Sequence, residues 1–166
     1  RWLGNSFSIS GGTALITVFI GATAGYAFAK KDFRGRGLLF GIVVATMLLP
    51  RQMLLIPNYL VAQSLSLTNS ILGVILTTVT PPSGIFPCRQ FMMNIPGGLL
   101  EAADMDGCGE IRKFVQIILP LAGPALGALF IFSFFSAWND YLWQLIMLED
   151  RALRTIPIGI ALFAQG

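Results

Sequence analysis

The sequence predicts an all-α polytopic membrane protein in which four transmembrane helices form a bundle. Hydrophobic residues occupy 55% of the 166 positions and charged residues only 11%, whereas soluble domains carry about 25% charged residues. Four apolar segments are each long enough to cross a hydrocarbon core, which takes roughly 20 helical residues. Because backbone polar groups in lipid must be satisfied within the protein, these segments are expected to be helices rather than strands of an open sheet.

The four predicted spans cover about residues 8–29, 37–61, 70–93 and 114–138. Residues 94–113 form a polar connection, and residues 139–166 form a tail after the fourth span, so that residues 1–166 make a single transmembrane domain. The chain begins with Arg1, and its first apolar run lacks the basic region and the cleavage site of a signal peptide. We therefore expect the chain to be part of a longer protein.

Basic residues gather at two connections, one after the first span and one before the fourth. They are Lys30, Lys31, Arg34 and Arg36 in the first connection, and Arg112 and Lys113 in the second. The positive-inside rule makes both connections cytoplasmic and places the tail outside. The sequence thus predicts a multi-pass protein with residues 94–113 inside the cell.

The second and third predicted spans contain helix breakers. An arginine at mid-membrane costs roughly 2.5–3.5 kcal/mol on insertion scales, so Arg51, after Pro50, is expected near the outer interface or facing a wet cavity. In the third span Thr77 and Thr80 precede Pro81. Broken backbone at membrane depth must be satisfied by protein, hydroxyls or water. Two interpretations stay open: the third span lines a transport pathway, or its prolines only kink it while the threonines bond their own backbone.

Residue types that carry catalysis or bind metals are scarce. Histidine is absent, and Cys88 and Cys108 are twenty positions apart without a zinc-binding spacing. The sequence has no GxxxxGK[ST] phosphate-binding loop, so the chain should not bind or hydrolyse ATP. Asp140 has no second acidic residue within a span. We therefore predict no catalytic, metal or cofactor site, and a transport role rather than an enzyme.

In the first span, Gly21 and Gly25 form a GxxxG step that predicts a close helix contact.

The acidic part of the connection 94–113 cannot sit in lipid. Residues 99–105 are good helix formers, Pro96 suits the first turn of a helix, and Gly107 can take the left-handed conformation that ends one. A second helix from about Glu110 should lead into the fourth span. The sequence therefore predicts a helix, a sharp turn and another helix.

A helix of about seven residues is not stable alone in water, where helices shorter than roughly 12–15 residues are marginal. We expect it to need a partner surface, although a self-packed hairpin is the alternative. Ala102 and Ala103 allow close approach, and Leu99 and Met105 offer apolar anchors. The acidic side chains that could meet basic groups of a partner are Glu101, Asp104, Asp106 and Glu110.

The spacing of Glu101-Ala102-Ala103, Gly107, Ile117 and Leu119-Pro120 resembles the EAA loop of permease subunits of binding-protein-dependent ABC importers. Other segments look like the carbohydrate-uptake branch, which includes the maltose transporter's membrane subunits. They are LGNS (3–6), AGYAFAK (24–30), FRGR (33–36), LIPNYL (55–60), RQF (89–91), FFSAWNDYLWQL (134–145) and RTIPIGI (154–160). The chain departs from the family pattern at Pro87-Cys88 and, mildly, at Cys108.

The resemblance implies a six-helix importer permease of a bacterial or archaeal cytoplasmic membrane, of which this chain is the central part. Its implied partners are an ABC ATPase dimer, which would bind ATP and Mg²⁺, a second permease subunit, an extracytoplasmic solute-binding protein and a sugar substrate. The implied ATPase-coupling residues are Leu100, Glu101, Ala102, Ala103, Asp106 and Gly107. Candidate pathway or gate residues are Thr77, Thr80, Trp138, Asn139, Asp140 and Trp143, although aromatic residues at this depth are more often interface anchors.

Two other functions remain open at this point. A secondary transporter or channel would need no ATPase, but it should carry ionisable residues deep in its spans, and only Arg51 and Arg89 come close. An ABC permease for a solute other than a sugar would share the same loop.

Overall fold

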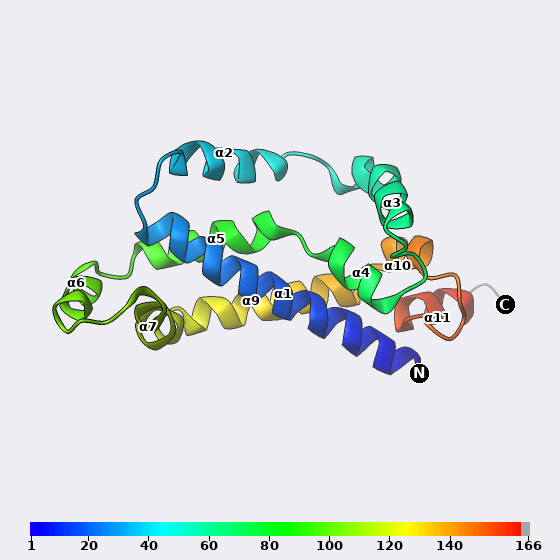
Figure 1. Cartoon of the computed structure of the whole chain (residues 1–166). Helices are drawn as coiled ribbons and strands as arrows, with labels where there is room; N and C mark the ends of the chain where they lie inside the picture. Colours follow the sequence, from blue (N-terminus) through cyan, green and yellow to red (C-terminus); the bar gives the residue numbers. More distant parts are fainter. Residues whose placement is uncertain (164–166) are drawn as a thin grey trace. The chain divides into compact units, whose positions relative to one another are not determined.

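The computed structural model describes residues 1–163, and every regular element among them is helical (Figure 1). The all-α polytopic prediction is confirmed. Helix α1, Trp2–Lys30, is long and apolar enough to cross a membrane alone. Three further segments pass the same test only as pairs of shorter helices, which gives up to four spans.

The remaining elements follow in chain order. The second predicted span overlaps α2 (Arg36–Thr46), the 3₁₀ helix η1 (Arg51–Leu54) and α3 (Leu55–Ser64), which extends beyond its predicted end, and the third contains α4 (Ile71–Thr78) and α5 (Pro81–Met93). Helix α6 (Gly98–Met105) lies in the polar connection. The fourth segment contains α7 (Glu110–Lys113), the π-helical η2 (Phe114–Ile118), α8 (Leu119–Leu121) and α9 (Gly123–Trp138). The predicted tail contains α10 (Tyr141–Met147) and α11 (Ile156–Phe163), and its last residues, 164–166, lie outside the described residues.

The breaks agree only in part with the predicted spans. The third segment breaks at residues 79–80, directly before Pro81, because the residue before a proline is pushed out of the helical region. Pro87, by contrast, lies inside α5 without ending it. The fourth segment was predicted as one span over 114–138, and in the structure its two parts meet at Ala122 and are bent by 74°. Pro124 falls in the first turn of α9, where a missing amide donor costs little, so the helix restarts there.

The described chain divides into two compact units. One contains residues 1–16, 49–80 and the described residues from 131 onward; the other contains residues 17–48 and 81–130. In the first unit α10 packs against α3, α4 and α11. Its buried core consists of Ile9, Ala62, Val74, Trp143, Met147, Leu148 and Ile158. Side chains of α1 hold the tail: Asn5 donates to the carbonyl oxygens of Ala152 and Arg154, at 2.9 and 3.0 Å.

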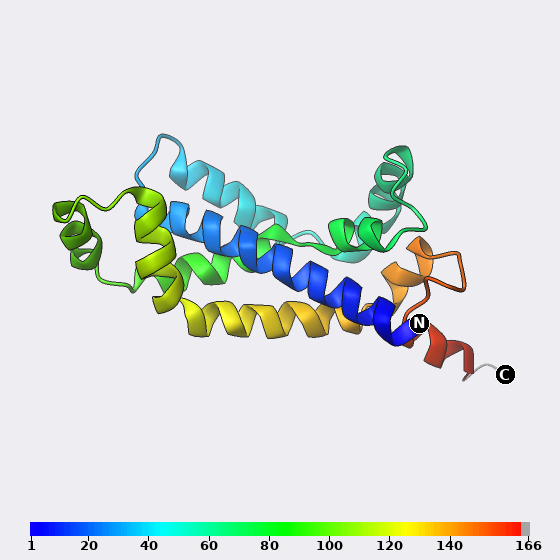
Figure 2. The same cartoon turned by 60° about the horizontal axis from the view of Figure 1, so that its bottom comes forward.

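The second unit is built on a close crossing of α1 and α5. A Cβ atom added to Gly25 would lie 2.7 Å from the Cβ of Cys88, and one added to Gly84 would lie 2.9 Å from the carbonyl oxygen of Thr17. The predicted close contact at the GxxxG step is therefore confirmed. The apolar core of this unit consists of Ala22, Tyr26, Met92, Ile95, Ile118 and Ala122. Helices α6 and α7 lie at the end of the unit where α1 ends (Figure 2).

Candidate functional site

Helix α6 ends in a turn with a fixed geometry. Gly107 has a φ of +73°, and its N–H donates to the carbonyl oxygen of Asp104 at 3.0 Å. The N–H of Cys108 donates to the carbonyl oxygen of Ala103 at 2.9 Å. This pair of bonds is a Schellman motif, which places a left-handed residue just after the helix. The predicted conformation of Gly107 is confirmed.

The start of α6 differs from the prediction. Pro96 was expected in the first helical turn, but the helix begins at Gly98, after the N-cap Gly97. Pro96 lies before the helix, and its carbonyl oxygen accepts a 3.3 Å hydrogen bond from the N–H of Leu99. The short helix therefore has eight residues.

The two faces of α6 have different environments. Ala103 is only 6% exposed, and Leu100 packs against the apolar core of the second unit. The outward face carries Met105, which is 89% exposed, together with Glu101 and Ala102. Of the six predicted coupling residues, four are exposed: Glu101, Ala102, Asp106 and Gly107. The two others, Leu100 and Ala103, lie on the face of the helix that is packed within the chain.

A network of ion pairs links α6, α7 and the end of α1. The ammonium group of Lys113 lies 2.5 Å from a carboxylate oxygen of Asp104 and 2.6 Å from one of Glu110. The other carboxylate oxygen of Glu110 pairs with Lys31 and accepts a 3.3 Å hydrogen bond from the hydroxyl of Tyr26. Asp104 and Glu110 were expected to meet basic groups of a partner. Within the chain both pair with Lys113, whose side chain is buried beside them.

Each of these contacts favours the charged form of its group. Hydrogen bonds from Lys113 and Lys31 lower the pKa of Glu110 from 4.5 to about 2. Hydrogen bonds to Asp104 and Glu110 raise the pKa of Lys113 above 10.5. Burial alone would lower the pKa of Lys31, but its hydrogen bonds to Glu110 and Tyr26 outweigh that effect and raise it. Glu110, Lys113 and Lys31 are therefore all charged at neutral pH.

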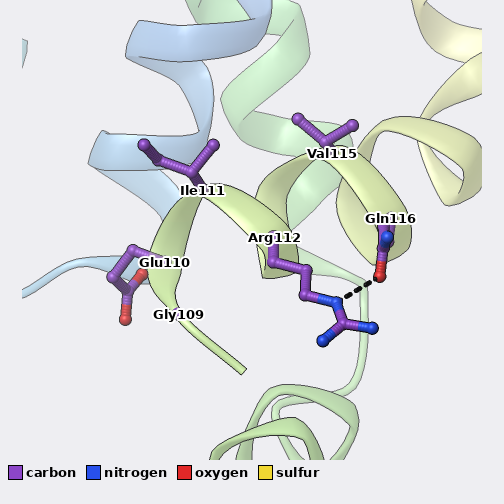
Figure 3. A pocket seen from close by; sticks show the side chains of 6 residues that line it. All are labelled: Gly109, Glu110, Ile111, Arg112, Val115 and Gln116. Carbon is purple, nitrogen blue, oxygen red and sulfur yellow. Dashed lines mark hydrogen bonds between the residues drawn. The ribbon is translucent and has the colours of Figure 1, made fainter. Parts of the chain in front are cut away.

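An open groove of about 640 Å³ runs along α7 and η2 (Figure 3). It is lined by Gly109, Glu110, Ile111, Arg112, Val115 and Gln116. Ile111 and Val115 are 81% and 50% exposed. The guanidinium of Arg112 donates a 2.9 Å hydrogen bond to the side-chain oxygen of Gln116. This surface was not predicted from the sequence, although apolar residues four positions apart on a helix were a signal for it.

Two candidate pathway residues meet in the first unit. The indole nitrogen of Trp143 donates to the hydroxyl of Thr77 at 3.0 Å, and Trp143 is only 4% exposed. The Thr77 hydroxyl in turn lies 2.7 Å from the carbonyl oxygen of Gly73, and that of Thr80 lies 3.2 Å from the carbonyl oxygen of Thr78. Both threonines thus bond backbone close to themselves, as the kinked-helix interpretation predicts. Trp143 is a buried core residue and not an exposed anchor.

Asp140 holds the start of α10. One carboxylate oxygen caps the helix by accepting a 3.3 Å hydrogen bond from the N–H of Trp143, and the other lies 3.5 Å from the guanidinium of Arg51. Asn139 bonds the carbonyl oxygen of Phe135 at 2.8 Å. The ring of Trp138 packs edge-on against Phe7 at 5.2 Å between centroids. Each of the candidate residues Trp138, Asn139 and Asp140 therefore makes structural contacts within its own chain.

Comparisons with known proteins agree with this architecture. Residues 12–164 match the family described as binding-protein-dependent transport system inner membrane component. The arabinooligosaccharides transport system permease protein AraQ of Bacillus subtilis (strain 168) is 36% identical over 161 residues, which are 97% of this chain and 57% of that protein. The sn-glycerol-3-phosphate transport system permease protein UgpE of Yersinia pestis bv. Antiqua (strain Antiqua) is 34% identical over 156 residues, 94% of this chain and 56% of that protein.

A solved structure is also similar. A chain in the crystal structure of a bacterial ABC transporter involved in the import of the acidic polysaccharide alginate matches with a TM-score of 0.81 and 30% identity, over 98% of this chain and 57% of that chain. The present chain thus spans a little more than half the length of these relatives. Because the family description covers almost the whole sequence, the chain belongs to the binding-protein-dependent transport system inner membrane components.

Proposed function

We propose that this chain forms the central part of a permease subunit of an ATP-driven ABC importer, which moves a sugar or oligosaccharide across a bacterial or archaeal cytoplasmic membrane. ATP would be hydrolysed by a separate ATPase dimer, and the outward face of α6 would dock on it. A second permease subunit would complete the pathway, and an extracytoplasmic binding protein would deliver the solute.

The observation that carries this proposal is the exposed face of α6. Glu101, Ala102 and Met105 point away from their own chain on a helix too short to be stable by itself. Its inner face is packed and its last turn is closed by the Schellman motif. Such a helix offers a rigid surface with one small residue, one apolar anchor and one carboxylate, which suits a cleft with basic groups.

The solute is the less constrained part of the proposal. Two of the relatives are named for carbohydrates, an arabinooligosaccharide and alginate, while the third is named for sn-glycerol-3-phosphate. That third relative specifically favours one alternative: an importer of a phosphorylated polyol. Uptake measured with labelled oligosaccharide and with labelled glycerol phosphate would separate the two.

A bulky substitution on the outward face tests the docking. In the full-length protein expressed with its ATPase, Ala102→Trp should abolish copurification of the ATPase and stop ATP-dependent uptake into proteoliposomes. Leu38→Trp is the matched control, because Leu38 is 72% exposed on α2, away from the loop. Equal copurification of both variants with the ATPase would contradict the proposal.

A further inference from the structure

The charge of Lys113 is buried where three helices of the second unit meet. Its side chain is only 4% exposed, whereas its partners Asp104 and Glu110 are 58% and 57% exposed. A buried ammonium group is costly unless it is paired and hydrogen-bonded. Here two carboxylates from different helices neutralise it, so the lysine holds α6 and α7 together.

The same network reaches the spans on both sides of the loop. Lys113 is the last residue of α7 and leads directly into η2, at the start of the fourth segment. Glu110 extends the network to the end of α1, because it pairs with Lys31 and accepts a hydrogen bond from Tyr26. The ring of Tyr26 also packs on that of Phe114, with 5.2 Å between centroids. Lys113 therefore connects α6 to the end of the first span and to the start of the fourth.

The backbone between α6 and α7 does not supply this stiffness by itself. Residues 106–109 contain two glycines, and at either one an added Cβ atom would meet no atom of residues 1–163 within 4 Å. The Schellman bonds close the last turn of α6 but do not reach α7. Without the ion pairs, this open segment and the packing of Leu100 and Ala103 would remain to hold α6 on the second unit.

We propose that Lys113 is a positioning residue that clamps α6 to the ends of the first and fourth spans, so that movement imposed on α6 is transmitted to the spans. This inference rests on the proposed function, in which an ATPase moves α6. A loop that bent at Gly109 would absorb part of the movement imposed on α6, whereas a clamped helix would pass that movement on to the spans.

The test compares Lys113→Met with Arg112→Met in the full-length transporter, reconstituted with its ATPase, second permease and binding protein. Methionine keeps the apolar stem and removes the charge. Arg112 is the matched control, because its guanidinium is exposed and bonds Gln116 only within the same helical segment. The readout is solute transported per ATP hydrolysed, together with copurification of the ATPase.

We expect Lys113→Met to keep the ATPase bound and to lower transport per ATP several-fold, while Arg112→Met leaves both unchanged. Lys113→Arg should restore most of the ratio, because a guanidinium can also bridge two carboxylates. An unchanged ratio in Lys113→Met would overturn the clamp.

A second variant covers the case in which Lys113→Met does not fold. Asp104→Asn alters the exposed partner of the lysine and should lower the ratio in part; an unchanged ratio would overturn the clamp. Failure of the wild-type protein to bind any ATPase would overturn the proposed function instead, and the role of Lys113 in transport with it.

Discussion

The indole nitrogen of Trp143 donates a 3.0 Å hydrogen bond to the hydroxyl of Thr77, which joins α10 to the last turn of α4. The two residues are 66 positions apart. Both were predicted from the sequence as candidate pathway residues, Thr77 in the third span and Trp143 after the fourth. Their contact fixes α10, the first element after the fourth segment, against the broken third segment.

Removing this hydrogen bond should lower the free energy of unfolding of the first unit by a modest amount. Trp143→Phe and Thr77→Val each delete one partner, and a double-mutant cycle isolates the coupling. Hydrogen bonds between membrane helices average about 0.6 kcal/mol in such cycles, so we expect a coupling energy of that order. The measured quantity is the free energy of unfolding of each variant in mixed detergent. A coupling of zero would show that the contact contributes nothing to stability.

A methyl group at Gly107 should be costly, whereas one at Gly109 should not. Both positions have open space around an added Cβ atom, but only Gly107 has a positive φ, +73°, against −68° at Gly109. Left-handed backbone costs a residue with a Cβ atom roughly 1–2 kcal/mol. Gly107→Ala should therefore lower the free energy of unfolding by about that amount. Equal thermal stability of the Gly107→Ala and Gly109→Ala variants would contradict the assigned turn.

The close crossing of α1 and α5 should not tolerate a larger residue at Gly84. An added Cβ atom would lie 2.9 Å from the backbone oxygen of Thr17, which cannot move aside as a flexible side chain can. Overpacking of this kind costs typically 1–3 kcal/mol, so Gly84→Ala should lower the melting temperature. Gly41→Ala on α2, where nothing lies within 4 Å, is the control and should be neutral or slightly stabilising. Identical melting of both variants would refute the crossing.

The ion pairs of the loop should be insensitive to pH over a wide range. The pKa of Glu110 is lowered from 4.5 to about 2, so its stabilising contribution is present above pH 4.5 and is lost as the pH falls toward 2. The pKa of Lys113 is raised above 10.5, so its contribution is present below pH 10.5 and is lost only at higher pH. The difference in thermal stability between wild type and Lys113→Met should be constant from about pH 5 to 10. A step in that difference near neutral pH would contradict these pairings.

Local signals in the sequence predicted the elements that depend on local chemistry. The apolar runs predicted helices, Gly107 predicted the end of α6, and the GxxxG step predicted the close contact of α1. What the sequence could not show was which polar residues pair across the fold. Asp104 and Glu110 look like free surface acids, and only the structure shows that both pair with the buried Lys113. The bend at Ala122 was missed because a long apolar run resembles a straight span even where Pro124 restarts the helix.

Site-directed crosslinking from Met105 shows directly whether the outward face of α6 docks on the ATPase. Met105 is 89% exposed on the outward face of α6, so a photoreactive residue placed there in the full-length transporter should crosslink to the ATPase subunit. The same group in place of Phe19, 69% exposed near the middle of α1, should not. We expect the Met105 crosslink in the assembled complex with and without ATP. Crosslinks from Met105 only to the solute-binding protein or to lipid, and never to the ATPase, would contradict docking of α6 on the ATPase.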